Sequence, residues 1–327
     1  MAAASIPTLR QCNFLTLSFS GAGHLLPYHL GVAVAIKSNE CSMGTPIHAV
    51  SGSSSGAIAA TLFVYFPRER IKDYADRFIS DGGRAMHHFK ELIVEANKSA
   101  EARYRNQQST SLANTRCSAE RFLPHSGQAM SHLRAMIDDA NASGEVLNPH
   151  NITLHIATTR CSYASLRLFD FPPNVSSIPV ESLVKCLEAS CKIPPHFHPF
   201  DVLPSKWPST YPEEDGVRID GISYVDGGIS APAPPTPVDS IEGACRVVIS
   251  PISGSLHSGS AIRISPIDNS WKFPLDMKCR GGFLVHPSVQ NFKAMQISAG
   301  LAASAPTLQE WYERGFEDAT TKLTNLY

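Results

Sequence analysis

The pentapeptide Gly52-Ser53-Ser54-Ser55-Gly56 has the residue types of a nucleophile held on a sharp turn. It follows the short apolar run 46–50 and precedes residues 57–66, which have the length and apolar character of a buried helix. A serine on such a strand-to-helix turn has strained dihedrals, and the flanking glycines let the two backbones approach closely. Its hydroxyl lies beside a helix N-terminus, where negative charge is favoured. The pattern predicts that Ser54 is a nucleophile; a purely structural Gly/Ser turn is the alternative.

A second segment, Gly21-Ala22-Gly23-His24, could hold the oxyanion that forms when a serine attacks an ester. It follows residues 12–20, which alternate as a strand does, and precedes an apolar helical stretch over 25–36. A glycine turn in this position points several backbone N–H groups toward one spot. Dinucleotide-binding turns begin in the same way, but Leu26 stands where their third glycine would be. We therefore expect the N–H groups of Gly21, Ala22 and Gly23 to bind an oxyanion.

Asp226 is the preferred candidate for the base that accepts the serine proton. It follows the strand-like residues 222–225 and precedes Gly227 and Gly228, so its carboxylate should emerge at a strand end where backbones can pass closely. A carboxylate within reach of a serine hydroxyl can act directly as general base. The same tripeptide at Asp81 follows an amphipathic helix instead, and we interpret that copy as structural.

A Ser-His-Asp triad is the open alternative to a Ser54/Asp226 dyad. His257 and His286 both follow Asp226, so the chain order Ser, Asp, His of α/β-hydrolases is available. His257 lies in a Ser- and Gly-rich loop, and His286 lies where a helix is expected to begin. Because neither has a feature that separates it from a solvated or structural histidine, the dyad is the preferred interpretation.

Length and composition narrow the class of protein. The chain has 327 residues, of which 43% are hydrophobic and 17% charged, and its net charge is −1. It can bury a large core, and the absence of a basic excess argues against a nucleic-acid partner. No apolar run is long enough to predict a membrane span, and no secretory signal is expected. Eight scattered cysteines without a CxxC pair indicate free thiols in a reducing compartment, and hence an intracellular, cytoplasmic protein.

Predicted strands and helices alternate along the whole chain. Beyond the segments above, we expect strands over 151–159, 163–171, 218–225 and 246–250, and helices over 71–79, 127–139, 180–191 and 288–323, the last broken near Pro306. This alternation predicts an α/β domain with a mostly parallel central sheet and helices on both faces. A single domain is expected over 12–323, after a short extension over 1–11. The polar stretch 95–118 is expected to be a surface insertion or a lid.

Taken together, these segments resemble the patatin-like phospholipase domain, most closely its adiponutrin and adipose triglyceride lipase branch. The resemblance covers residues 12–323 and rests on motifs at 18–32, 189–194, 224–230 and 290–319. It implies a three-layer patatin-like fold, a Ser54/Asp226 dyad and an oxyanion turn, with the supporting glycines Gly52, Gly56, Gly227 and Gly228. Two segments depart from the family pattern: Leu25-Leu26-Pro27 replaces a further glycine, and Ala231–Pro235 replaces an Asn/Asp-Leu-Pro segment.

The resemblance implies a lipid acyl hydrolase that cleaves glycerolipid esters, triacylglycerol or phospholipid, through an acyl-enzyme and without metal or organic cofactor. Such an enzyme meets its substrate at a membrane or lipid-droplet surface, to which it binds peripherally; a protein co-activator is not identified by the sequence. Two alternatives stay open. One is a Ser-His-Asp carboxylesterase acting on soluble esters. The other is a catalytically weak lipid-binding or regulatory protein, whose oxyanion turn is altered by Leu26-Pro27.

Overall fold

The computed structural model describes residues 12–82, 124–143, 148–173, 179–194, 209–255, 261–298 and 303–326. The extension over 1–11 and the insertion over 95–118 lie outside these residues. The main strands are β1 (Phe14–Phe19), β2 (Ile47–Ser53), β3 (Thr153–Arg160), β4 (Ser165–Phe171), β5 (Val217–Ile219), β6 (Ile222–Asp226), β7 (Ala244–Ile249) and β8 (Ala261–Ile264). The α-helices are α1 (Leu26–Met43), α2 (Ser55–Tyr65), a helix over 68–82, α4 (Pro124–Ser143), α5 (Val180–Ser190), α6 (Val289–Ser298) and α7 (Ala305–Leu326).

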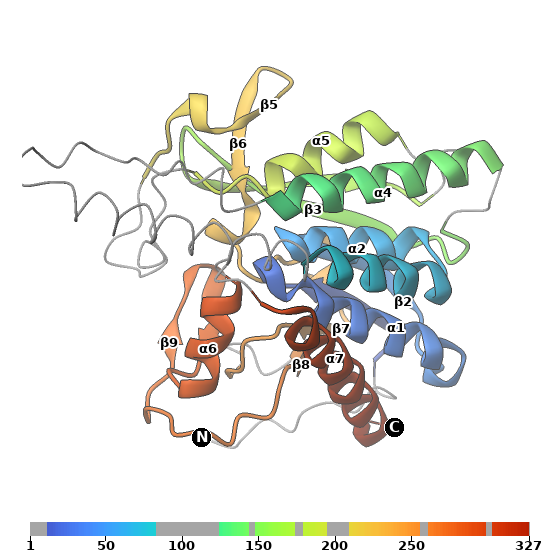
Figure 1. The fold of residues 1–327 in the computed structure, drawn as a ribbon, viewed down its shortest axis with the longest axis vertical. Helices are drawn as coiled ribbons and strands as arrows, with labels where there is room; N and C mark the ends of the chain where they lie inside the picture. Colours follow the sequence, from blue (N-terminus) through green and yellow to red (C-terminus); the bar gives the residue numbers. More distant parts are fainter. Residues whose placement is uncertain are drawn as a thin grey trace, which may run out of the picture.

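One eight-stranded sheet organises these elements, in the order β5-β6-β3-β2-β1-β7-β8 with β4 paired to β3. Strands β3, β2, β1, β7 and β8 are parallel, and β4, β5 and β6 are antiparallel to their neighbours. This mixed, mostly parallel sheet with helices confirms the predicted α/β fold. Figure 1 shows α1, α2, α4 and α5 side by side across the front of the sheet.

Apolar and hydroxyl-bearing side chains alternate along β1, so the two faces of the sheet differ in what packs against them. Leu15, Leu17 and Phe19 are directed to the helices, where the Phe19 ring lies 6.2 Å from the Phe63 ring of α2. Helix α2 is buried at all its positions, which explains why it is apolar around its whole circumference. The alternate residues of β1, Thr16 and Ser18, are buried on the other side of the strand and make hydrogen bonds there.

A proline-rich segment, residues 231–236, crosses this hydroxyl-bearing face, and we call it the proline strap. The hydroxyls of Ser18 and Ser51 each donate to the Pro234 carbonyl at 2.7 Å, and the Ser53 hydroxyl donates to the Pro232 carbonyl at 2.9 Å. Since proline has no N–H group, the strap brings carbonyl acceptors into the buried face with few donors to satisfy. The strap thus covers this face of the sheet by pairing its carbonyls with buried serine hydroxyls.

The segment between β8 and α7 forms a lobe at the carboxyl ends of β7 and β8. It contains the short hairpin β9 (Met277–Lys278) and β10 (Leu284–Val285), followed by α6. Strands β8, β9 and β10 were not expected from the sequence, and α6 begins at Val289 after a loop that holds His286. In Figure 1 this lobe lies to the left of α7. No helix within the described ranges is both long and apolar enough to span a membrane.

Candidate active site

Strand β3 brings the predicted nucleophile and base together, because β2 and β6 share one of its edges. Residues 153–157 of β3 pair with β2, and residues 158–160 pair with β6. The opposite edge is occupied by β4 over residues 154–160. Since a strand has only two edges, β6 continues along β3 from the point where β2 ends. Ser53 is opposite Ala157 and Asp226 is opposite Thr158, so the two chains meet at Ser54 and Asp226.

Ser54 has the strained conformation that the sequence predicts. Its φ is 52° and its ψ is −132°, and it forms the N-cap of α2. A Cβ on Gly52 would lie 2.3 Å from the Gly56 carbonyl oxygen, and a Cβ on Gly56 would lie 2.3 Å from the Ser20 carbonyl oxygen. Both glycines therefore permit the close approach of strand and helix that was expected of them. The elbow is confirmed as a strand-turn-helix unit.

Ser190, at the end of α5, links the elbow to β3. Its hydroxyl accepts a hydrogen bond from the Ser54 N–H at 2.9 Å and donates one to the Ala157 carbonyl at 2.7 Å. Two residues further on, the Lys192 carbonyl accepts the Asp226 N–H at 2.8 Å. One short segment thus holds the backbones of both Ser54 and Asp226. Ser190 was not among the predicted site residues, and its only signal in the sequence was the motif at 189–194.

The Asp226 carboxyl group is buried in a site that supplies little compensation for its charge. Its Oδ1 accepts the Gly228 N–H at 2.7 Å, whereas Oδ2 is buried without a hydrogen-bond partner among the described residues. Burial raises the pKa of Asp226 to about 6, an effect that the Ser54 hydroxyl and the Gly228 N–H partly oppose. Above this pH the carboxylate is ionised with a free acceptor oxygen, as a general base requires.

The Ser54 hydroxyl lies near the Asp226 carboxylate but does not form a standard hydrogen bond with it. It is close enough to lower the pKa of Asp226, yet neither oxygen of Asp226 accepts it within normal hydrogen-bond geometry. The two groups are therefore close to each other without being hydrogen-bonded. Such loose contacts are common in unliganded active sites and tighten when substrate binds.

Cys191 is also near Asp226. Burial, followed by the Asp226 charge, raises the pKa of its thiol, which stays protonated.

The glycine turn provides fewer free N–H groups than expected. The Gly21 N–H donates to the Pro232 carbonyl at 2.9 Å, so its expected role as an oxyanion donor is not supported. The Ala22 N–H donates to the Ser55 hydroxyl at a longer 3.2 Å. The Gly23 N–H has no partner among the described residues, and its φ is 51°. We therefore assign the free donor of this turn to Gly23, with Ala22 available if Ser55 rotates.

Gly21 instead provides space between the three motifs. A Cβ on it would lie 3.5 Å from the Ser54 Cβ and 3.7 Å from the Gly228 Cα. The other glycine of the aspartate motif, Gly227, passes close to β3, since a Cβ there would lie 2.1 Å from the Ala157 carbonyl oxygen. The turn, the elbow and the aspartate motif therefore converge on one small space above β3, as the sequence predicted.

His29 forms a hydrogen bond with the residue that precedes the glycine turn. Its side chain is fully buried, and its Nε2 lies 2.8 Å from the Ser20 carbonyl oxygen. Because a carbonyl only accepts, Nε2 carries the proton. Burial lowers the pKa of His29 to about 4, against the opposing effect of the Ser20 hydrogen bond, so the ring is neutral at physiological pH. His29 therefore positions the backbone that leads into Gly21.

Of the two histidines considered for the alternative triad, the structure describes only His286. His257 lies outside the described residues. The Nε2 of His286 lies 3.3 Å from Asp276, and its backbone N–H donates to the Ser253 carbonyl at 3.1 Å. His286 thus has a carboxylate partner within its own lobe, different from Asp226.

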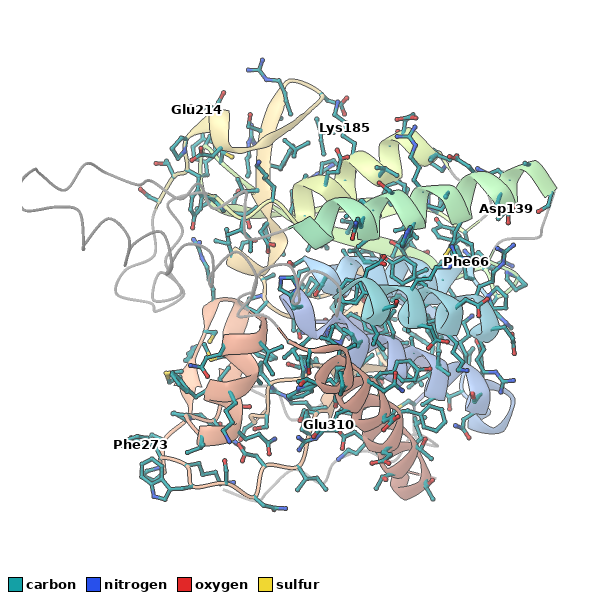
Figure 2. All side chains as sticks on the ribbon, viewed as in Figure 1. Phe66, Asp139, Lys185, Glu214, Phe273 and Glu310 are labelled. Carbon is teal, nitrogen blue, oxygen red and sulfur yellow. The ribbon has the colours of Figure 1, made fainter. Side chains whose placement is uncertain are left out.

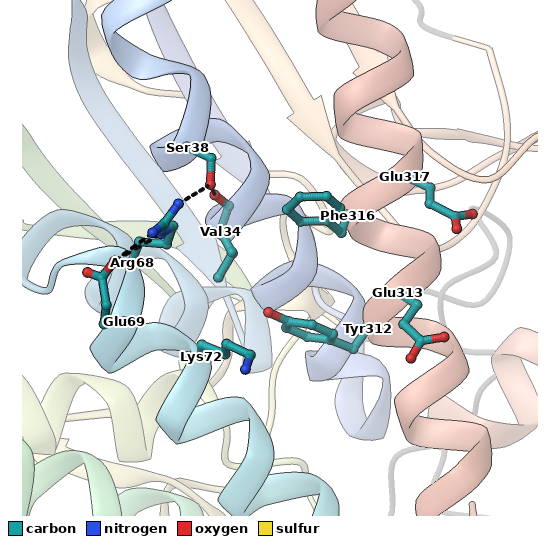
Figure 3. A pocket seen from close by; sticks show the side chains of 9 residues that line it. All are labelled: Val34, Ser38, Arg68, Glu69, Lys72, Tyr312, Glu313, Phe316 and Glu317. Atoms are coloured by element: carbon teal, nitrogen blue, oxygen red, sulfur yellow. Dashed lines mark hydrogen bonds and ion pairs between the residues drawn. The ribbon is translucent and has the colours of Figure 1, made fainter.

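A cavity of about 490 Å³ lies elsewhere, between α1, the helix over 68–82 and α7 (Figure 3). Its lining contains both cationic and anionic side chains, namely Arg68, Lys72, Glu69, Glu313 and Glu317. None of its lining residues belongs to the turn, the elbow or the aspartate motif.

Comparison with known proteins gives one family match. The family model described as patatin-like phospholipase matches residues 17–239, a span that contains the glycine turn, Ser54 and Asp226. Among solved structures, VipD from Legionella pneumophila is similar at 13% identity and a TM-score of 0.40, over 96% of this chain and 67% of that one. A chain of the ExoU-SpcU complex from the type III secretion system of Pseudomonas aeruginosa is similar at 14% identity and a TM-score of 0.37. That match covers 98% of this chain and 52% of the other, about half its length. No curated protein matches the sequence.

The raised pKa of Asp226 predicts how Asp226→Asn changes stability. Between pH 3.8 and about 6 the folded protein holds this proton and the unfolded chain does not, so stability falls as pH rises through this window. Asp226→Asn removes the buried charge and should raise the free energy of unfolding at pH 8 by on the order of 2 kcal/mol. Denaturant unfolding of the wild type and of Asp226→Asn, measured at pH 8 and below pH 4, tests this. The comparison below pH 4 is the internal control, because the wild-type carboxyl group is then protonated. An equal effect at both values would contradict it.

Proposed function

The chain belongs to the patatin-like phospholipase family, and on that premise we propose that it is a lipid acyl hydrolase using a Ser54/Asp226 dyad. The observation that carries this proposal is the meeting of β2 and β6 on one edge of β3. It brings a strained, buried serine up to a buried carboxylate whose Oδ2 is free among the described residues. A nucleophile and an adjacent base are the minimum that acyl transfer needs.

In the proposed first step, the Ser54 hydroxyl attacks the ester carbonyl carbon while its proton moves to Asp226 Oδ2. The carbonyl oxygen becomes an oxyanion. Donors near it would be the free N–H of Gly23 and the N–H of Ser55 at the N-terminus of α2, where the helix favours negative charge. Collapse of the intermediate expels the alcohol, which takes the proton from Asp226 and leaves an acyl-Ser54 ester.

In the second step, Asp226 takes a proton from water as the water attacks the acyl carbon. The new oxyanion occupies the same donors. Collapse returns the proton to Ser54 and releases the fatty acid. Because both steps need an ionised carboxylate, activity should fall as pH decreases through about 6, where Asp226 becomes protonated. An imidazole base of ordinary pKa near 6.5 titrates in almost the same range, so the position of the pH profile alone does not separate dyad from triad.

We propose glycerolipid esters as substrates, either triacylglycerol or phospholipid, in line with the sequence resemblance to the adiponutrin and adipose triglyceride lipase branch. The protein would meet them at a membrane or lipid-droplet surface inside the cell. Measurement of the fatty acids released from triacylglycerol, phosphatidylcholine and galactolipid, each offered separately, would identify the preferred class.

Substitution of the two proposed catalytic residues should abolish ester hydrolysis. Ser54→Ala and Asp226→Asn should each lower kcat/KM by roughly 10³-fold or more, because neither variant retains both nucleophile and base. His286→Ala, the matched control, should keep most activity, since this side chain is paired with Asp276. The measurement is turnover of one short ester, with circular dichroism to verify folding. Loss of similar size in His286→Ala or His257→Ala would favour a triad, and absence of turnover in the wild type would favour a lipid-binding protein.

Gly21→Ala should lower activity without disturbing the fold. Its added methyl group makes only ordinary contacts, 3.5 Å from the Ser54 Cβ and 3.7 Å from the Gly228 Cα, but it enters the space where an ester must bind. We expect kcat/KM to fall by at least about tenfold, with an unchanged melting temperature. Gly23→Ala is the contrasting variant: its methyl would lie 2.0 Å from the Ser298 carbonyl oxygen, so it should unfold at lower temperature. Full activity in Gly21→Ala would place the ester elsewhere.

A further inference from the structure

The lobe after β8 exposes an unusual group of large apolar side chains, which we call the apolar patch. It consists of Trp271, Phe273, Leu275, Val289, Phe292 and Met295, whose exposed fractions are 67%, 57%, 79%, 48%, 63% and 38%. Figure 2 shows Phe273 projecting outward at the periphery of the molecule. Scattered exposed apolar residues are normal, but a contiguous group usually marks a binding surface.

Helix α6 is amphipathic in the reverse of the usual sense. It buries Asn291 and Ala294 and directs Val289, Phe292 and Met295 to solvent, at the spacing that places them on one face. Asn291 is needed inside, because its side chain makes hydrogen bonds with the backbone of Ser253 and the carbonyl of His286. The exposed residues have no comparable role in packing, so the fold does not account for them.

The loop over 271–275 and α6 form one continuous surface. The Val289 N–H donates to the Trp271 carbonyl at 3.3 Å, and the Phe273 N–H donates to the Pro287 carbonyl at 3.0 Å. The rings of Trp271 and Phe273 meet edge to face with centres 4.8 Å apart. Backbone pairing therefore holds the two aromatic side chains beside the apolar face of the helix.

Helix α6, which carries three residues of the apolar patch, ends beside the glycine turn. Helix α6 ends at Ser298, whose carbonyl oxygen would lie 2.0 Å from a Cβ on Gly23. The lobe is attached at the carboxyl ends of the parallel strands, through the hydrogen bond from the His286 N–H to the Ser253 carbonyl after β7. Ser54 lies at the carboxyl end of β2, the same edge of the sheet. A surface bound to the patch would thus be close to the site.

The lobe is also positively charged. Residues 265–298 contain four Lys and Arg residues against two Asp and no Glu, a net charge of +2, whereas the whole chain carries −1. Both aspartates have partners, since Asp276 lies beside His286 and Asp268 accepts hydrogen bonds from serine hydroxyls. The exposed lysines Lys272, Lys278 and Lys293 form no ion pair with any described carboxylate.

We propose that the apolar patch and its three lysines bind the surface of anionic phospholipid bilayers, so that Ser54 faces the lipid. The proposal rests on the proposed lipid hydrolase function and names the surface by which that site reaches its substrate. Trp, Phe and Leu side chains partition into the interface between headgroups and acyl chains. Lysines at the rim extend their ammonium groups to anionic headgroups, each contributing about 1 kcal/mol near such a surface.

Vesicle sedimentation tests this surface independently of catalysis. We expect the full chain to bind phosphatidylcholine vesicles that contain phosphatidylserine at least about tenfold more strongly than phosphatidylcholine alone. Trp271→Ser combined with Phe273→Ser should reduce that binding by about tenfold or more. The matched control is Ile241→Ser, which changes a residue 52% exposed before β7, at the opposite edge of the sheet from Ser54; it should bind as the wild type does.

Turnover of a soluble short ester distinguishes this proposal from the proposed function. The double variant should retain it, because the patch does not touch the reacting atoms. Vesicle binding by a wild type that hydrolyses no ester would support the surface and reject the function.

Several results would overturn the proposal. Wild-type binding retained in the double variant would place the lipid surface elsewhere, and equal binding to both vesicle types would remove the role of the lysines. A dimer that dissociates in the double variant, without vesicle binding, would make the patch an interface between copies. If the double variant melts at lower temperature, Phe292→Ser on α6 provides the same test.

Discussion

The pairing of β2 and β6 along a single edge of β3 is the constraint on which the proposed site depends. It places residues 53 and 226 opposite consecutive positions of β3, although they are far apart in sequence. Both backbones are then fixed by the end of α5 and the residues that follow it, through the Ser190 hydroxyl and the Lys192 carbonyl. A shift of either strand would move its side chain to the other face of the sheet, so this register is what allows Ser54 and Asp226 to meet.

The site holds two unfavourable features that the surrounding fold stabilises. A non-glycine residue at φ 52° costs on the order of 1–3 kcal/mol, and the buried Asp226 carboxylate is ionised only above a pH of about 6. Buried hydrogen bonds hold the strained region in place, chiefly those between the proline strap and the serines of β1 and β2. Strain and a perturbed carboxyl pKa in one place are typical of a functional site.

Local signals made the main elements predictable from sequence. The pentapeptide around Ser54 and the strand before Asp226 each have short-range patterns that fix a turn or a strand end, and the structure forms both. The sequence did not show that the Gly21 N–H is occupied, because the Pro232 carbonyl that accepts it lies more than 200 residues away. Ser190 was missed for the same reason: its partners Ser54 and Ala157 are distant in sequence. Strands β9 and β10, of two residues each, are too short to show alternation.

The pH dependence of covalent labelling tests the dyad most directly, because it reports on the nucleophile before any substrate preference enters. The second-order rate at which a fluorophosphonate modifies Ser54 would be measured from pH 4 to 9, with the labelled peptide identified by mass. The dyad predicts a rate that rises through about pH 6 in the wild type and in His286→Ala, near the pKa of Asp226. In Asp226→Asn the rate should be low and lack this midpoint. An unchanged titration in Asp226→Asn, or its loss in His286→Ala, would contradict the account.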